Sequence, residues 1–486
     1  MADARSNAQL SLLDGLICAF LALPLLLFCA WFKWPVAIGF ALLILHAFHK
    51  ATIGAWRREP SVQTRLVVTI ALVSLAWTAM TGIGHFVYAN LDWVTRDAVL
   101  RDLTATAWPP EYPTIFNTPL ILRAPVGYYL PAAAAGSVLG LQAADFLLYC
   151  WTALGFALFL CAVTTLFSTA RQRFIACALM IGFGGLDILG VPFYRGFWAS
   201  LGDHIEWWAG FAQYSSNSTL MFWAPNHALP AWLGLVLVLR HWRQPQLARI
   251  APLMAAAVPL WSPLAAAGLT PFFIAGLNWR HDARQLFSLH GGLPLFAISG
   301  VVARYITMDT QALAHGWAID GFYPPTFWFS YVAFCLLEFG FLALVLFRLR
   351  TFDLRMGIAL AILLLLPFYR FGPGNDLVMR CSISALAILA LAAVRPLADG
   401  GRNFWRYALM LILGIGVVGA AQEPERAFMA PRWALTGQTL VEISPAGQPG
   451  SNYVGQLTQP GIALMMRTPT LVQPDPPKPG ASGQTN

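Results

Sequence analysis

Residues 85–123 read HFVYANLDWVTRDAVLRDLTATAWPPEYPTIFNTPLILR and form the longest polar interval between the apolar segments of this chain. Charge is rare elsewhere, because Asp, Glu, Lys and Arg together make up only 11% of the 486 residues. A dense block of both signs beside Trp93 and Trp108 therefore predicts a loop with a binding or catalytic task. The charged residues of this first polar loop are Asp92, Arg96, Asp97, Arg101, Asp102, Glu111 and Arg123.

The composition places the chain among integral membrane proteins. Hydrophobic residues make up 58% of it, and the mean hydropathy is +0.62. Repeated apolar runs of about 20 residues predict transmembrane helices. The run at 15–32 lacks a basic segment and a small-residue cleavage site, which predicts a retained first helix. The seven cysteines lie in or beside apolar segments without metal-ligand spacing, so we expect no disulfides. The net charge of +8 does not indicate nucleic-acid binding, because the arginines are scattered between the spans.

We predict an all-α polytopic membrane protein of about 13 transmembrane helices. The apolar spans are 15–32, 35–49, 66–84, 143–168, 174–192, 223–239, 250–260, 263–278, 290–307, 323–347, 356–369, 380–394 and 405–421. The intervening segments alternate in charge, and the arginine-rich ones, such as 50–65, are expected in the cytoplasm. The acid-bearing segments are expected outside; they are 85–125, 193–222, 308–322, 370–379 and the tail after 421.

Two stretches are too short for ordinary spans. If 126–140 crossed the membrane, Arg171 and Arg173 would lie outside, so we predict a re-entrant or interfacial helix there. The pair 250–260 and 263–278, broken at Trp261-Ser262-Pro263, predicts half-helices with polar ends at a cavity. We divide the chain into a membrane domain, 1–421, and a Pro- and Gly-rich outer tail, 422–486, disordered at its end.

Within the first polar loop, Asp92 and Arg96, like Asp97 and Arg101, are spaced i,i+4. This spacing predicts a short amphipathic helix over 90–103 at the outer surface. Self-paired surface charges would explain the pattern equally simply. We favour a functional site, because the charges follow a span directly and stand beside two tryptophans.

A second polar group is YRFGPGNDLVMRCS, residues 369–382. Gly372-Pro373-Gly374 predicts a tight turn between two helices. Arg380 begins a span at headgroup depth, where a guanidinium fork suits a phosphate or pyrophosphate. A snorkelling arginine or a helix-end pair with Asp376 is the alternative. The polar residues of this group are Arg370, Asn375, Asp376 and Arg380.

A third group is YSSNSTLMFWAPNHALPAW, residues 214–232. Hydroxyls and amides with Trp223 and Trp232 suit a sugar, although an interfacial aromatic belt with a helix cap is an equal alternative. The hydrogen-bonding residues are Ser215, Ser216, Asn217, Ser218, Thr219, Asn226 and His227. Two acids, Asp187 and Glu338, fall inside spans and are expected to face a polar cavity; for Glu338 a helix–helix hydrogen bond is the alternative.

No P-loop, H-E-x-x-H, G-x-S-x-G or C-x-x-C pattern is present, so nothing supports ATP hydrolysis, zinc proteolysis or serine hydrolysis. Three stretches, GIGHFVYANLDWVTRDAVLRDL…WP, YSSNSTLMFWAPNHALPAWL and GPGNDLVMRCSISAL, look similar to uncharacterised bacterial members of the polytopic GT-C glycosyltransferase superfamily. The likeness covers most of residues 65–395. It implies 10–14 helices, a polyprenyl-phosphate-type sugar donor, inverting transfer outside the cytoplasmic membrane, and an acidic base in the first outer loop.

The chain departs from the pattern that the resemblance implies. Adjacent acids are absent, and single acids stand at 92, 97 and 102. The identity of the base and the need for a divalent cation therefore stay open. Transfer needs a carboxylate for the acceptor proton, cations for the departing phosphate, and an aromatic, amide-rich cleft for the sugar.

These needs give each candidate residue a role. Asp92 or Asp97 is the expected base. The expected substrate-binding residues are Arg96, Arg123, Asp187, Asn226, His227, Arg370, Asn375, Asp376 and Arg380. Within this set, Arg370 and Arg380, with Arg123, are expected on the phosphate. The expected partners are a lipid-linked sugar donor, a glycan or lipid acceptor and membrane lipids, with no nucleic acid. The expected location is a bacterial inner membrane, with the site facing the periplasm. The competing hypotheses are an O-antigen-type polymerase or ligase and a lipid-linked-sugar transporter or flippase.

Overall fold

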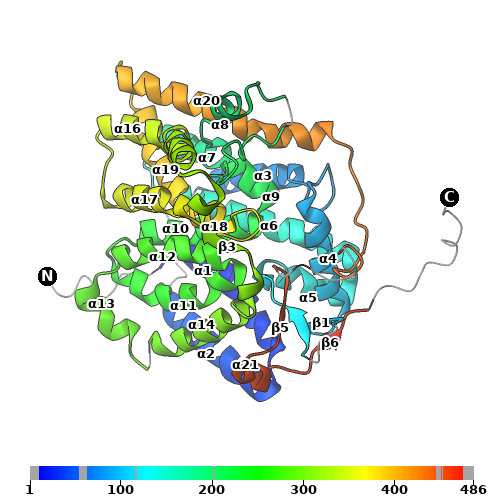
Figure 1. Cartoon of the computed structure of the whole chain (residues 1–486). Helices are drawn as coiled ribbons and strands as arrows, with labels where there is room; N and C mark the ends of the chain where they lie inside the picture. Colours follow the sequence, from blue (N-terminus) through cyan, green and yellow to red (C-terminus); the bar gives the residue numbers. More distant parts are fainter. Residues whose placement is uncertain are drawn as a thin grey trace, which may run out of the picture.

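The computed structural model shows a mostly helical molecule (Figure 1). Positions 57 and 58 in the predicted cytoplasmic segment and the end of the tail lie outside the residues that it describes. Those described are 10–53, 63–114, 118–200, 203–289, 291–444, 450 and 452–473.

The described helices follow the apolar periodicity of the sequence, with short connections. They are α1 Leu12–Phe28, α2 Trp34–Thr52, α3 Thr64–Met80, α4 Asp92–Ala105, α5 Leu130–Leu139, α6 Leu141–Thr164, α7 Ala170–Gly182, α8 Asp187–Arg195, α9 Asn217–Trp223, α10 Pro225–Arg240, α11 Pro245–Trp261, α12 Pro263–Gly276, α13 Trp279–Leu286, α14 Leu293–Ile306, α15 Pro324–Cys335, α16 Phe341–Arg348, α17 Leu354–Leu365, α18 Asp376–Cys381, α19 Ile383–Ala398, α20 Phe404–Met429 and α21 Pro460–Met465.

Several of these helices could cross a bilayer, which agrees with the predicted all-α membrane class. In the described part of the chain, seven helical stretches are long and apolar enough to do so. They are Leu12–Trp31, Trp34–Thr52, Leu141–Thr164, Ala170–Arg195, Pro324–Arg348, Asp376–Ala398 and Phe404–Met429. Shorter apolar helices, including Thr64–Met80 and Pro263–Gly276, fill the space between them.

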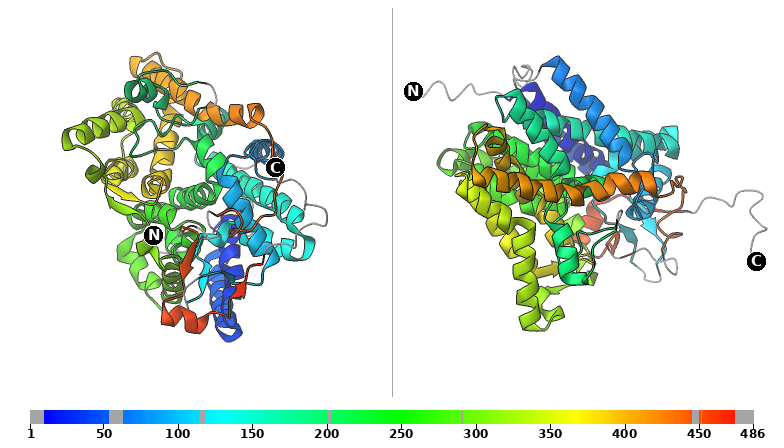
Figure 2. Two further views of the ribbon diagram at one scale, coloured as in Figure 1. Left: turned by 45° about the vertical axis from the view of Figure 1, so that its right-hand side comes forward. Right: turned by 90° about the horizontal axis from the view of Figure 1, so that it is seen from above.

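The burial pattern is that of a protein with an apolar outside. Large apolar side chains such as Leu42 on α2 and Leu72 on α3 are each 62% exposed. The helices that carry such residues, together with α20, lie at the periphery in Figure 2. By contrast, α10 is buried at nearly every position. Lipid tails are as apolar as leucine, so outward-facing leucines suit a bilayer and not water.

Three predicted spans are interrupted rather than continuous. Within 174–192, α7 ends at Gly182 and α8 begins at Asp187. Within 323–347, residues Leu336–Gly340 form a π-helical segment between α15 and α16. Near 380–394, α18 and α19 meet at Ser382. Helix α20 packs closely against the first of these breaks, because a Cβ at Gly416 would overlap the Gly184 carbonyl oxygen.

Two small sheets join segments that are far apart in sequence. One has the order β5-β2-β1-β6, with β1 parallel to β6 and the other pairs antiparallel. The second pairs β3 with β4 in antiparallel register. The strands are β1 Pro110–Tyr112, β2 Leu120–Leu122, β3 His315–Trp317, β4 Tyr369–Phe371, β5 Val454–Gln456 and β6 Thr470–Leu471.

The first sheet includes residues that follow position 421. Helix α20 runs on to Met429, and the chain then follows α4 down to the sheet (Figure 1). Trp433 Nε1 donates to the Ala89 carbonyl at 2.8 Å, and the Leu440 amide donates to Asp102 at 3.1 Å. The part of the tail that the structure describes is therefore packed onto the first polar loop.

Candidate functional site

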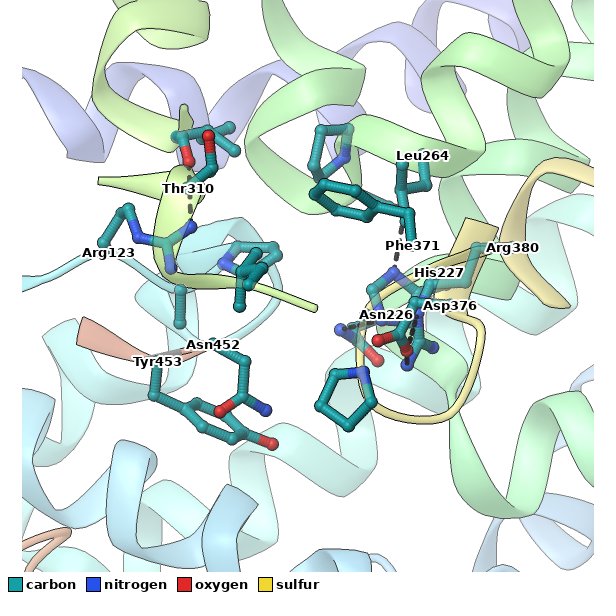
Figure 3. Close-up of a pocket in the computed structure, with 18 of the residues that line it drawn as sticks. Arg123, Asn226, His227, Leu264, Thr310, Phe371, Asp376, Arg380, Asn452 and Tyr453 are labelled. Atoms are coloured by element: carbon teal, nitrogen blue, oxygen red, sulfur yellow. Dashed lines mark hydrogen bonds and ion pairs between the residues drawn. The ribbon is translucent and has the colours of Figure 1, made fainter. Parts of the chain in front are cut away.

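A cavity of about 230 Å³ lies where the first polar loop, several helix ends and the tail meet (Figure 3). We call it the charged cavity, because arginines, carboxylates, an amide and an imidazole line it. It unites most of the residues that the sequence analysis assigns to the site, although they come from distant stretches of the chain. Those in its wall are Asp92, Arg96, Arg123, Asn226, His227, Asp376 and Arg380.

Helix α4 carries Asp92 and Arg96 into the cavity wall. The predicted i,i+4 pair is formed, with Arg96 Nη2 3.6 Å from Asp92 Oδ2. Arg96 is buried and donates from Nη1 to Asn226 Oδ1 at 2.7 Å. The side chain of Asp92 is 49% exposed, so its carboxylate is accessible to a bound substrate.

The surroundings of α4 correct the predicted surface helix. The helix is buried from Arg96 to Thr104 and packs against α5 and α6. The predicted pair of Asp97 with Arg101 is not formed, because Asp97 bonds to His85 while Arg101 lies 3.4 Å from Asp102. Of the two predicted i,i+4 pairs, only Asp92 with Arg96 is therefore formed, and this pair lines the cavity.

Two longer helices begin at the cavity, as predicted for the break at Ser262. Asn226 and His227 lie in the first turn of α10, and Ser262 caps α12 by accepting from the Ala265 amide. Asn226 Oδ1 accepts from Arg96, so its Nδ2 donates to His227 Nε2 at 3.1 Å. His227 Nδ1 then donates to Ser262 Oγ at 2.6 Å, which makes the imidazole neutral. The partial positive charge of both helix N-termini adds to that of the arginines.

The turn at Gly372 sets the position of Arg380. Arg380 Nε donates to Asp376 Oδ1 at 3.0 Å, so the predicted alternative of a helix-end pair is present. Both residues nevertheless line the cavity. Gly372 has φ +85°, and a Cβ there would overlap the Asp376 carboxylate. Only glycine fits this turn without moving the Asp376–Arg380 pair.

Arg123 enters the cavity together with the C-terminal tail. Its Nη1 donates to the Ile306 carbonyl at 3.1 Å, and its Nη2 lies 3.5 Å from the Val454 carbonyl. Asn452 and Tyr453, just before β5, complete this wall. Sequence reasoning missed both of them, because an amide and an aromatic in a Pro- and Gly-rich tail give no signal until the tail pairs with β2.

Asp97, the other candidate base, does not line the cavity. It is buried and lies 3.0 Å from His85 Nε2, while His85 Nδ1 lies 3.1 Å from Asp145. Burial lowers the pKa of His85. The hydrogen bonds from His85 to Asp145 and Asp97, and the negative charges of these two residues, have a larger opposite effect and raise the pKa of His85 to about 9. Burial raises the pKa of Asp97 to about 6 against the opposing effect of His85. The three residues form a charge cluster that joins the α3–α4 turn to α4 and α6.

His85, Asp97 and Asp145 lie close enough together to be considered as metal ligands. Among the described residues, this is the one such group of histidine, cysteine and carboxylate side chains. Its two carboxylates contact different nitrogens of one ring. An imidazole offers one nitrogen to a metal, so the arrangement fits hydrogen bonding better than coordination. We assign no metal to it.

Three other predicted residues lie outside the cavity. Arg370 is exposed on β4, with Nη2 3.5 Å from the Pro373 carbonyl. Asn375 is buried and donates to the Phe211 carbonyl at 2.8 Å, which fixes the loop. Asp187 is fully buried beside Glu338, away from the cavity. The cations in the cavity wall are therefore Arg96, Arg123 and Arg380, and not Arg370.

The serine- and threonine-rich run at 215–219 packs inside the protein. Ser216 caps α9, and Asn217 Nδ2 donates to the Leu179 carbonyl at 3.2 Å. Thr219 Oγ1 donates to Glu206 Oε1 at 2.6 Å. The helix-cap alternative therefore describes this run, and only Asn226 and His227 of the third polar group reach the cavity.

Comparison of the chain with protein-family models, with curated proteins and with solved structures found no match.

Proposed function

We propose that this protein is a membrane glycosyltransferase that moves a sugar from a polyprenyl-phosphate-type lipid donor to a glycan or lipid acceptor. The observation that carries the proposal is the charged cavity. It combines three arginines, two helix N-termini and the accessible carboxylate of Asp92 within one wall. Neutral partners for hydroxyl groups, including Asn226, Asn452 and Tyr453, complete the lining. A site for inverting transfer from a lipid phosphate needs this combination.

The residues divide the chemistry between them. The acceptor oxygen attacks the anomeric carbon, and the bond from that carbon to the phosphate oxygen breaks. Asp92 takes the acceptor proton, because its carboxylate is half exposed whereas Asp97 is enclosed with His85. Arg380 and Arg123, with Arg96, bind the phosphate that leaves with both bonding electrons. Asn226 is held by Arg96 and orients the sugar hydroxyls.

We further propose a GT-C-like arrangement of about 13 spans, in which the shorter apolar helices also cross. Helix α5, ten residues long and followed by the Gly140 turn, would be the re-entrant or interfacial element. The membrane would be a bacterial cytoplasmic membrane, with the charged cavity facing the periplasm.

The distribution of charge along two helices supports this orientation. A second cleft is lined by Arg350, Arg355 and Arg395 together with Asp353 and Asp399. We call it the basic cleft, because the segments that bound it, 348–355 and 395–406, each carry three arginines and one aspartate. Helix α10 runs from Asn226 at the charged cavity to Leu239 at the basic cleft, and α18 and α19 run from Arg380 to Arg395. The basic cleft is therefore at the opposite end of the same helices, where the positive-inside rule places the cytoplasm.

Arg380 provides the test of the donor site. We expect Arg380→Lys to weaken binding of a polyprenyl-phosphate sugar in nanodiscs, and Arg380→Ala to weaken it more, because lysine cannot bind two phosphate oxygens as a planar fork. Arg370→Lys and Arg370→Ala are the matched controls, since Arg370 neighbours the turn but lies outside the cavity. Equal affinity of wild type and both Arg380 variants would contradict the proposal.

Two further measurements, transfer activity and movement of the lipid-linked sugar, separate the competing hypotheses. Loss of activity in the arginine variants with full activity in Asp92→Asn would favour an O-antigen-type polymerase or ligase, which needs outer arginines and no carboxylate base. Movement of the intact lipid-linked sugar across proteoliposomes without transfer would favour a flippase.

A further inference from the structure

Buried carboxyl groups meet at a second place, away from the charged cavity. Asp187 begins α8, directly after the unwound residues 183–186 that follow α7. Glu338 lies in the π-helical segment Leu336–Gly340. The two residues are 0% and 3% exposed. π-helical turns and broken membrane helices recur where ions or substrates bind.

The two carboxyl groups face each other and lack most of the donors that a buried carboxylate needs. One oxygen of each carboxyl group lies beside the backbone of Gly185. Trp208 Nε1 donates to Glu338 Oε1 at 2.7 Å. No other described residue donates to Glu338 Oε2 or to either oxygen of Asp187. A Cβ at Gly185 would overlap Glu338 Oε2 and lie 3.3 Å from Asp187 Oδ2, so these oxygens converge on the unwound backbone.

The neighbouring charged groups are engaged elsewhere. Glu206 accepts from the Ser216 amide, Thr219 and Gln213, which gives this carboxylate three donors. Glu423 of α20 has Arg426 3.2 Å away.

The nearby histidine, His204, faces Glu423 rather than Asp187 or Glu338. His204 Nδ1 lies 3.9 Å from Glu423 Oε1. Among the described residues, no arginine, lysine or histidine pairs with Asp187 or Glu338. Two unpaired carboxylates side by side inside a protein cannot both stay ionised without a bound cation.

We propose that Asp187 and Glu338 form a binding site for one small monovalent cation, a proton or Na⁺. Three unshared carboxylate oxygens, two of Asp187 and one of Glu338, supply hard oxygen ligands. The cation would join the start of α8 to the π-helical segment, and so connect two broken membrane helices. This site is independent of the glycosyltransferase proposal, because neither residue lines the charged cavity.

Infrared spectroscopy and thermal unfolding of the purified full-length protein in nanodiscs test the site. If the cation is a proton, wild type at neutral pH shows a protonated carboxyl band that NaCl leaves unchanged. If it is Na⁺, NaCl removes that band, or raises the unfolding temperature above that in choline chloride at equal ionic strength. Glu338→Gln and Asp187→Asn should each abolish whichever signal wild type shows.

Glu423→Gln is the matched control, because Glu423 is also buried but has Arg426 as its partner. It should keep the wild-type signal. The proposal is overturned if wild type shows neither a protonated carboxyl band nor a Na⁺-specific stabilisation. It is also overturned if both variants fold and reproduce the wild-type signal. Should these variants fail to fold, Glu338→Asp, which keeps a carboxyl group on a shorter side chain, replaces them: it should weaken or shift the wild-type signal, and an unchanged signal would overturn the proposal.

Discussion

Asp92 holds its carboxylate half exposed in the cavity wall, 3.6 Å from Arg96. We expect Asp92→Asn to lower sugar transfer by roughly 10²–10⁴-fold, because the amide keeps the shape of the side chain but cannot accept the acceptor proton. Donor binding should change far less. Asp320→Asn, at an exposed acid outside the cavity, is the control. The assay is transfer from a synthetic lipid-phosphate sugar, and a fully active Asp92→Asn enzyme would exclude this residue as the base.

His85 predicts how stability depends on pH. Its pKa is raised from 6.5 to about 9, so the folded protein holds the proton more tightly than the unfolded chain. The stabilisation is therefore complete below about pH 6.5 and is lost as the pH rises through 9, at a cost of ~3 kcal/mol. Asp97 acts at lower pH: its pKa is raised from 3.8 to about 6, so its ionisation lowers stability across that interval.

Thermal unfolding in detergent from pH 6 to 10 measures the effect of His85. The unfolding temperature of wild type should fall across this range, and His85→Gln should have a lower and flatter curve. His315→Gln, at an exposed histidine, should follow wild type. Parallel curves for wild type and His85→Gln would show that the imidazole does not carry the charge assigned to it.

At the scale of elements, a substitution at Gly372 tests whether the turn before α18 positions Asp376 and Arg380. Gly372→Ala should destabilise the protein by about 1–2 kcal/mol, because φ is positive there and the methyl group would displace the Asp376 carboxylate. It should also weaken donor binding, since Arg380 moves with Asp376. Gly400→Ala, where the Cβ would meet nothing, should change neither property. Unchanged donor affinity in folded Gly372→Ala would separate the turn from the site.

Hydropathy located most helices but not their interruptions. The break at Ser262 was predictable, because Trp-Ser-Pro stops one helix and caps the next. The break after Gly182 and the π-helical segment lie within stretches that are apolar enough on average to be predicted as single spans. They depend on tertiary contacts, such as the Leu186 amide donating to the Leu337 carbonyl at 3.1 Å, which no sequence window contains.

At the scale of the whole molecule, the predicted topology can be tested by cysteine labelling in intact cells. A cysteine at the exposed position 105 should react with an impermeant reagent, because the first polar loop is expected outside. A cysteine at the exposed position 402, near the basic cleft, should react only after permeabilisation. The parent protein, whose seven cysteines are free thiols, sets the background. The reverse pattern would overturn the proposed orientation.

The sequence predicted that candidate residues from distant loops would lie close together, because the acid-bearing loops were expected on one face of the membrane. Asp92, Asn226 and Arg380 therefore meet although they come from different loops. The strand pairing of the tail was not predictable, because strands of two or three residues become stable only against β1 and β2. Which carboxylate reaches the cavity was also beyond the sequence, since Asp92 and Asp97 have the same spacing to an arginine.

The sheet that joins the tail to the first polar loop has a consequence for biosynthesis. Arg123 and Val454 are separated by 331 residues, and contact between them completes the cavity wall. A ribosome must therefore deliver almost the entire chain to the membrane before β5 can pair with β2. Until then, β2 has an open edge and Arg123 lacks one of its carbonyl acceptors. The cavity wall is therefore completed last, and a nascent chain that stalls before residue 454 would be inserted without it.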